Sequence, residues 1–337
     1  MLNSRELVYK TLNFENPIRA PRQLWKLPWA DDHYPEEVKR IEEDFPTDFD
    51  GPPGYHEKQP HTEGNPYEIG EYVDEWGCKF INKQKGIIGE VKEPLVKEDD
   101  WADAKHINIP EEWLTINQDK INAYCNKSSK FLMAGCCPRP FERLQFIRGT
   151  ENLYIDLMMR PKKMFGFIEE MHDFYCRLLT KWAQTDVDAL SIMDDWGAQN
   201  SLLINPKMWV EIFKPLYKDY IDIAHQHGKK IFMHSDGYIL DIYPHLIDLG
   251  LDAINSQIFC MGIDQLKQFK GHITFWGEMD RQYLLARGTT QEVEEAVTEI
   301  KEKLWHNGGC IAQLEFGAGA KPENVYTTYD TWNKLFK

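Results

Sequence analysis

The chain has 337 residues, 42% of them hydrophobic, and a formal net charge of −15. A chain of this length can bury a full core, and its negative charge argues against binding to nucleic acid or to an anionic membrane surface. No apolar run approaches the roughly 18 residues that a membrane-spanning helix needs, and the first residues lack the apolar region of a signal peptide. We therefore expect a cytoplasmic protein.

The seven cysteines are scattered along the chain and contain no C-x-x-C motif. An odd number of cysteines fits poorly with a disulfide framework, and the missing motif argues against a structural zinc ribbon. We expect most of these thiols to be small buried hydrophobic groups.

The N-terminal part of the chain contains short predicted elements separated by irregular segments. Residues 1–14 have a helical pattern with Ser4 as a candidate cap, and residues 110–126 also look helical. Residues 31–70 are acidic and rich in proline and glycine, which predicts a long irregular excursion across a surface or over a site. Residues 71–82 and 85–93 form a hairpin-like pair.

From about residue 130, apolar runs of strand length alternate with helical segments. The runs cover residues 131–134, 189–193, 231–233, 253–255, 273–276 and 310–314, with an earlier candidate at 23–25; the helices cover 139–158, 161–183, 206–227, 239–249, 262–269 and 290–306. Such alternation predicts parallel strands with crossover helices. Seven or eight such units favour a closed (β/α)8 TIM barrel. No G-x-G-x-x-G motif follows any of the predicted strands, so a dinucleotide-binding sheet has no direct support. We expect one domain over 1–337, with an irregular N-terminal extension and the first barrel elements in 1–128 and the regular part in 129–337.

Polar residues follow five consecutive predicted strands. They include Asp194, Asp195, His234, Asp236, Asn255, Gln257, Glu278, Gln313 and Glu315. The active site of a barrel lies at the C-terminal ends of its strands, so these side chains are expected to share one mouth. The alternative is that they are polar only because loops contact water and because aspartate caps helices.

The segment His234-Ser235-Asp236-Gly237 is the most informative motif. Side chains at i and i+2 of a strand point the same way, so His234 and Asp236 are expected to share a pocket as metal ligands or as an acid–base pair. Glu315 is a better third ligand than Cys310, which begins its strand and belongs at the opposite end of the barrel. A mixed N/O set suits zinc, iron or manganese. The alternative is a core histidine bonded to a carbonyl.

Several motifs resemble the uroporphyrinogen decarboxylase superfamily. They are Asp194-Asp195-Trp196-Gly197, the His234 motif, Leu249–Asn255, Trp276–Asp280, Pro322–Val325 and, for one branch, Val73–Gly77. The resemblance implies a (β/α)8 barrel with its site at the strand C-termini. One branch decarboxylates uroporphyrinogen III without a cofactor, and the other contains cobalamin-dependent methyltransferases that use zinc.

The chain departs from both branches at identifiable positions. The decarboxylases carry an arginine-rich N-terminal segment, whereas Pro21–Lys26 lacks its second arginine. The methyltransferases typically have His-x-Cys where this chain has His234 and Asp236, and a further cysteine near the position of Leu314 or Glu315. The usual thiolate site is therefore incomplete, which fits better with Lewis-acid or proton assistance to an O- or N-methyl donor.

The leading hypothesis is a methyltransferase that moves a methyl group between a small methylated substrate and cobalamin on a corrinoid-binding partner. Zinc or another divalent metal would be held by His234, Asp236 and Glu315, while His234, Asp195 and Glu278 would take catalytic roles. The candidate substrate-binding residues are Asp194, Trp25, Trp76, Trp196, Gln257 and Gln313. A cofactor-free decarboxylase or lyase using Arg22, Arg139 and Arg281, and a non-catalytic small-molecule-binding barrel, remain alternatives.

Overall fold

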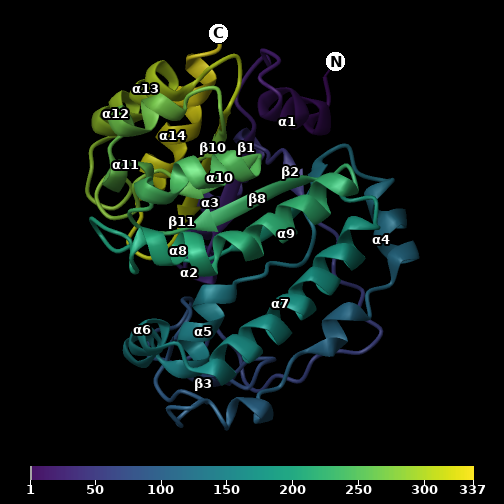
Figure 1. Cartoon of the computed structure of the whole chain (residues 1–337). Helices are drawn as coiled ribbons and strands as arrows, with labels where there is room; N and C mark the ends of the chain where they lie inside the picture. The colour runs from purple at the N-terminus through teal and green to yellow at the C-terminus, as the bar shows by residue number, and fades with distance from the viewer. Residues whose placement is uncertain (1) are drawn as a thin grey trace.

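The computed structural model describes residues 2–337, and Figure 1 shows a central sheet surrounded by helices. Six parallel strands pair in the order β1-β11-β10-β9-β8-β7. Their bounds are β1 Arg22–Lys26, β7 Ala189–Met193, β8 Lys230–Ser235, β9 Ala253–Ser256, β10 Thr274–Trp276 and β11 Cys310–Phe316. A second parallel pair consists of β2 (Phe49–Asp50) and β6 (Phe131–Leu132).

The two sheets meet at both edges of the six-stranded sheet. The backbone N–H of Asp48 donates to the carbonyl of Arg22 at 2.9 Å, which links the β2 segment to β1. On the other side, Met133 forms a parallel bridge with Ala189 and links the β6 segment to β7. The parallel sheet therefore curls round, and the C-terminal ends of its strands meet at one end.

Helices connect the strands and cover the outside of the sheet (Figure 1). Their bounds are α1 Ser4–Leu12, α2 Pro28–His33, α3 Pro35–Asp44, α4 Gln118–Cys125, α5 Pro140–Arg148, α6 Thr150–Met159, α7 Lys162–Ala183, α8 Pro206–Ile212, α9 Lys214–Gln226, α10 Tyr243–Leu249, α11 Ile258–Met261, α12 Ile263–Leu266, α13 Thr290–Leu304 and α14 Pro322–Lys334. Among residues 2–337, none of these helices is long and apolar enough to cross a membrane.

Two helices that were predicted as continuous are each divided in the structure. Gly149 separates α5 from α6 with a φ of 79°, a value that suits glycine because it lacks a Cβ atom. The predicted helix over 206–227 is interrupted at Phe213. The next helix begins at Lys214, and Pro215 lies in its first turn, because proline cannot donate the N–H that a continuous helix requires.

The N-terminal region is more regular than the sequence indicated. Asn3, rather than Ser4, caps α1, because its side chain and Glu6 form a reciprocal capping box. The segment 31–70 was predicted to be irregular, but it contains the second half of α2, all of α3 and the strand β2. The predicted hairpin is confirmed as an antiparallel sheet with strands β3 (Gly70–Val73), β4 (Lys79–Asn82) and β5 (Glu90–Val91).

An aromatic cluster fills the interior of the curled sheet. Phe49, Phe131, Phe232 and Trp276 are buried, and the Phe131 and Phe232 ring centroids lie 5.8 Å apart. The ring of Phe232 meets Trp276 edge-on at 4.9 Å. Because side chains two residues apart on a strand point the same way, this packing also directs His234 of β8 inward, one layer closer to the C-terminal end.

Candidate metal and acid–base site

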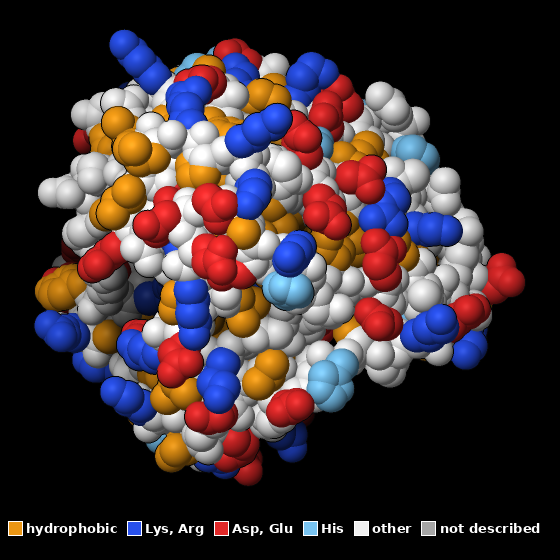
Figure 2. Space-filling model, turned by 60° about the horizontal axis from the view of Figure 1, so that its bottom comes forward, with side chains coloured by type: hydrophobic (Ala, Val, Ile, Leu, Met, Phe, Trp, Pro, Cys, Tyr) orange, Lys and Arg blue, Asp and Glu red, His pale blue; other side chains and the backbone are white. Residues whose placement is uncertain are grey.

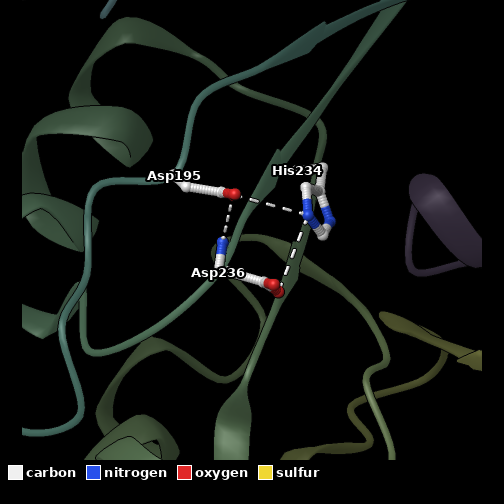
Figure 3. Close-up of side chains that lie close together, drawn as sticks. All are labelled: Asp195, His234 and Asp236. Carbon is white, nitrogen blue, oxygen red and sulfur yellow. Dashed lines mark hydrogen bonds and ion pairs between the residues drawn. The ribbon is translucent and has the colours of Figure 1, made fainter. Parts of the chain in front are cut away.

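Three polar side chains converge where β7 and β8 end (Figure 3). The Nε2 atom of His234 lies 3.6 Å from an oxygen of Asp195 and 3.6 Å from an oxygen of Asp236. One ligand atom from each residue lies within 4.8 Å of the other two. Among residues 2–337, this is the one group of His, Cys, Asp or Glu side chains that satisfies that criterion. The structure therefore brings together His234 and Asp236, as predicted, but adds Asp195 as the third member.

Asn255 sets the orientation of the imidazole. Its Nδ2 group donates to the Gln313 side-chain oxygen at 2.7 Å and to the backbone carbonyl of Trp276, so Oδ1 is left to face His234. That oxygen lies 2.6 Å from Nδ1 of His234 and must accept a hydrogen bond from it. The Nδ1 proton is thereby assigned, and Nε2 is directed at the two carboxylates.

Asp195 is held by the backbone of the neighbouring strand end. Its Oδ1 accepts the N–H of Asp236 at 2.9 Å, which fixes the carboxylate beside the imidazole. Burial and the nearby Glu142 carboxylate raise the pKa of Asp195 to about 6, although His234 acts in the opposite direction. A carboxyl group with this pKa can exchange a proton near neutral pH.

Arg281 neutralises the other side of the site. Its Nη2 atom lies 2.6 and 2.8 Å from the two oxygens of Asp236, and its Nη1 atom lies 3.0 Å from an oxygen of Glu315. Its Nε atom is 2.8 Å from Glu278, which is 2% exposed. Burial raises the pKa of Glu278 despite the opposing effect of Arg281. Glu315, predicted to be a metal ligand, is therefore paired with a guanidinium and lies outside the three-residue group.

Asp194 is directed toward the protein backbone. It is completely buried, and its oxygens accept the N–H groups of Phe141 at 3.0 Å and Glu142 at 2.7 Å. The hydroxyl of Tyr217 donates to the same carboxylate at 2.5 Å. These bonds place Asp194 at the N-terminal end of α5, where a negative charge satisfies free backbone donors. Its observed role is to attach α5 to the end of β7.

The three candidate tryptophans occupy different environments. Trp25 is partly exposed, and its ring centroid lies 5.4 Å from that of His234, so it belongs to the site. Trp196 is completely buried, stacks on Phe141 at 3.9 Å and donates to Tyr217. Trp76 is 1% exposed. Trp76 and Trp196 are thus core residues, which the sequence could not reveal because a large ring suits both a core and a binding wall.

The two candidate glutamines support different parts of the site. The side-chain oxygen of Gln257 accepts the N–H of Gly237 at 3.2 Å, which supports the loop that follows Asp236. Gln313 accepts a hydrogen bond from Asn255, while its buried Nε2 group has no hydrogen-bond partner among residues 2–337. Gln313 therefore acts on His234 through Asn255.

A cavity of about 890 Å³ opens beside Asp195. It lies between the loop that precedes α5 and the β3-β4-β5 sheet, and three residues of the predicted excursion over 31–70, His56, Pro66 and Tyr67, also line it. The lining includes Asp195, Glu142, Arg139, Arg143, Cys137, Tyr72, Phe80, Trp113, Phe146 and Trp182. The face in Figure 2 is hollowed at its left side, with a basic side chain in the depth of the hollow. The volume lies in the range of small-molecule sites.

Sequence reasoning did not assign site roles to several residues that the structure brings here. Asn255 was noted only as a polar residue after a strand, and Arg281 only as a possible substrate-binding cation. Arg143 and Glu142 lie on α5 and were read only as part of a helix. These four residues lie 21 to 92 positions from His234 along the chain, so no local spacing signal connects them to it.

Comparisons with known proteins agree with the architecture. Residues 72–335 match the uroporphyrinogen decarboxylase (URO-D) family. A methyltransferase from Methanosarcina mazei has a similar solved structure, with a TM-score of 0.72, 12% identity and coverage of 100% of both chains. A dihydropteroate synthase from Coxiella burnetii matches less well, with a TM-score of 0.31, 14% identity, and coverage of 44% of this chain and 57% of that one. No curated protein matches. The chain belongs to the uroporphyrinogen decarboxylase family.

Proposed function

We propose that this protein is a methyltransferase that passes a methyl group from a small methylated compound to the corrinoid of a partner protein. The curled parallel sheet would be the (β/α)8 barrel expected from the sequence, with the reaction at its C-terminal end. Membership of the uroporphyrinogen decarboxylase family and the likeness in fold to a methyltransferase support this class.

The observation that carries the proposal is the environment of the His234 Nε2 atom. Since Nδ1 donates to Asn255, a neutral imidazole presents a lone pair at Nε2 toward two carboxylate oxygens, each 3.6 Å away. Lone pairs facing anions repel, so the arrangement requires a cation or a proton between them. Zinc bonds of about 2.1 Å in a tetrahedral site would place ligand atoms roughly 3.4 Å apart, which fits these distances.

His234, Asp195 and Asp236 would therefore hold a divalent metal such as zinc. Three protein ligands leave a position open for substrate, as in catalytic zinc sites. A bound ion would supply a Lewis acid that withdraws electron density from the oxygen or nitrogen carrying the methyl group. Glu315 would contribute indirectly, because it shares Arg281 with Asp236.

Proton delivery offers a second use of the same residues. When the bond from the methyl carbon to its oxygen or nitrogen breaks, the leaving atom must gain a proton or coordinate a cation. Asp195 lines the cavity, and its pKa of about 6 suits a proton donor. One carboxyl group cannot coordinate a metal and donate a proton at the same time, so metal occupancy decides which role Asp195 takes.

A cofactor-free decarboxylase is the second candidate, favoured by the family match. It would need cations for substrate carboxylates. Arg22 bonds to Asn333 of α14 and does not line the cavity, and Arg281 is engaged by three carboxylates. Arg139 alone of the three candidates lines the cavity. We therefore place this reaction second to methyl transfer.

The first experiment measures metal content by mass spectrometry after purification without a chelator. We expect about one divalent ion per chain in the wild type, loss of the ion in His234→Ala, and retention in His225→Ala. His225 is a matched control because it pairs with Asp252 near the surface. A wild-type protein that neither contains nor takes up zinc, manganese or iron would refute the metal role.

The second experiment tests the reaction itself. The protein is incubated with a reduced corrinoid protein and a panel of methyl ethers and methylamines, and formation of methylcobalamin is followed by absorbance. The same samples are assayed for release of carbon dioxide from carboxylated substrates. Methylcobalamin formation that is lost in His234→Ala is the expected result. Carbon dioxide release without methyl transfer would support the second candidate instead.

A further inference from the structure

We infer that the cavity beside Asp195 binds a planar aromatic compound with a single carboxylate, and that Arg139 receives this carboxylate. The inference rests on the proposed function, because it names the class of compound that would carry the methyl group. It follows from unused donors, aromatic walls and the balance of charge in the cavity.

Arg139 has donors to spare. Its guanidinium contacts Glu142 through Nη1 at 2.9 Å, and no other side-chain hydrogen bond of Arg139 occurs among residues 2–337. The side chain lines the cavity and remains 31% exposed. A guanidinium carries five N–H donors in a planar fork that matches a carboxylate. The free part of the fork is therefore available to a ligand in the cavity.

Two further donors, on residues of the cavity lining, lack a partner within the described chain. They are Nε of Arg143 and the indole Nε1 of Trp182, and both atoms are buried. Arg143 uses Nη1 for Asp74, so its Nε group is left unpaired. Leaving a buried donor unpaired costs about 1–3 kcal/mol, which an acceptor oxygen on a ligand would offset. These donors favour an oxygen-bearing ligand over a hydrocarbon or an amine.

Aromatic rings form much of the remaining wall. They belong to Tyr67, Tyr72, Phe80, Trp113, Phe146 and Trp182. Rings prefer offset-stacked or edge-to-face contacts with other rings, so such a wall suits a flat aromatic ligand. Its volume of about 890 Å³ is large enough for a single-ring compound.

The charges in the wall argue against a ligand with several carboxylates. Each basic residue is already paired with an acidic one: Lys92 with Glu90, Arg139 with Glu142, and Arg143 with Asp74. Asp195 and Glu75 also line the cavity and add negative charge that no lysine or arginine in the lining offsets. A polyanion would be repelled, whereas one carboxylate can share the guanidinium of Arg139 with Glu142.

The test is a calorimetric titration of chelator-treated protein with 4-methoxybenzoate, 4-methoxybenzyl alcohol and 4-methoxybenzylamine. These probes keep the ring and methyl ether and change only the charged group. We expect the carboxylate to bind best in the wild type, and Arg139→Gln to weaken its binding about tenfold and to abolish the preference over the alcohol. Arg160→Gln is the control, because Arg160 forms an exposed bidentate pair with Glu211.

Trp182→Phe is the second variant, and it retains an aromatic ring while removing one unpaired donor. We expect it to weaken carboxylate binding several-fold. The inference is overturned if 4-methoxybenzoate fails to bind at about 10 mM, if the amine binds better, or if Arg139→Gln binds the carboxylate as the wild type does. The titration contains no metal and no corrinoid, so it tests binding alone. If 4-methoxybenzoate binds as expected but the methyl-transfer assay shows no transfer, the proposed function is contradicted and the inference about binding stands.

Discussion

The Nδ1 atom of His234 lies 2.6 Å from Oδ1 of Asn255, and this hydrogen bond decides which face of the imidazole meets the acidic residues. A second bond from Asn255 to Gln313 holds the amide in place. The pair resembles the supporting contacts of metal-binding histidines, in which the second ring nitrogen donates to a fixed acceptor. The first prediction tests this relationship.

Replacement of Asn255 by alanine should weaken metal binding by about 10- to 100-fold, because the imidazole loses its fixed orientation. It should also lower the free energy of unfolding by about 1–3 kcal/mol, since buried partners remain unpaired. Asn324→Ala is the control, because Asn324 is buried and bonds to Leu284 but lies in α14. Titration with zinc and urea denaturation measure the two effects. Equal loss of metal affinity in both variants would contradict the specific role of Asn255.

Arg281 should compete with a metal ion for Asp236. It places a fixed positive charge within 2.6 Å of the carboxylate that would coordinate the metal. We expect Arg281→Gln to bind zinc at least several-fold more tightly than the wild type, because a cation repels a nearby cation. Calorimetric titration of chelator-treated protein checks this, with Arg160→Gln as the surface control. Unchanged or weaker zinc binding would show that Arg281 supports the site instead.

Asp195 should make stability depend on pH in a defined direction. Its pKa of about 6 in the folded protein exceeds the ordinary value of 3.8. Between these values the folded state binds more protons than the unfolded state, so this group stabilises the protein increasingly as pH falls from about 6 toward 4. Asp195→Asn should therefore be more stable than the wild type at pH 7–8, and the difference should vanish below about pH 4.

Urea denaturation of chelator-treated wild type and Asp195→Asn across this pH range measures the difference. The comparison cancels contributions from the other titrating groups, apart from those in contact with Asp195. A difference in stability that stays constant with pH, or that grows as the pH is lowered, would contradict the raised pKa.

Asp194 should matter for stability more than for substrate binding. It accepts two backbone N–H groups of α5 and the hydroxyl of Tyr217. Asp194→Ala should lower the free energy of unfolding by about 2–3 kcal/mol, because it leaves buried donors without a partner. Tyr217→Phe should cost less, and the double variant should lose less than the sum of the two. Additive losses would show that the two groups act independently.

The strands, crossover helices and polar strand ends were predictable because their signals are local. These signals are the period of the hydrophobic pattern, the length of each apolar run and the i, i+2 spacing of His234 and Asp236. All three are properties of neighbouring residues. The very short strand Phe49–Asp50 escaped prediction because two residues cannot show a period. The burial of Trp196 could not be predicted either, because an aromatic residue after a strand fits both a core and a cavity wall.

The sequence by itself determined that β7 and β8 each end in acidic or imidazole groups, and that His234 and Asp236 point to the same side. Only the tertiary structure decided their partners. Asp195 joins His234 because β7 pairs with β8 in parallel register, with Met193 opposite His234. Glu315 turns to Arg281 instead, because the loop after β10 carries that guanidinium between Asp236 and Glu315. These pairings depend on the distances between charged groups in three dimensions, and the spacing of residues along the chain does not predict those distances.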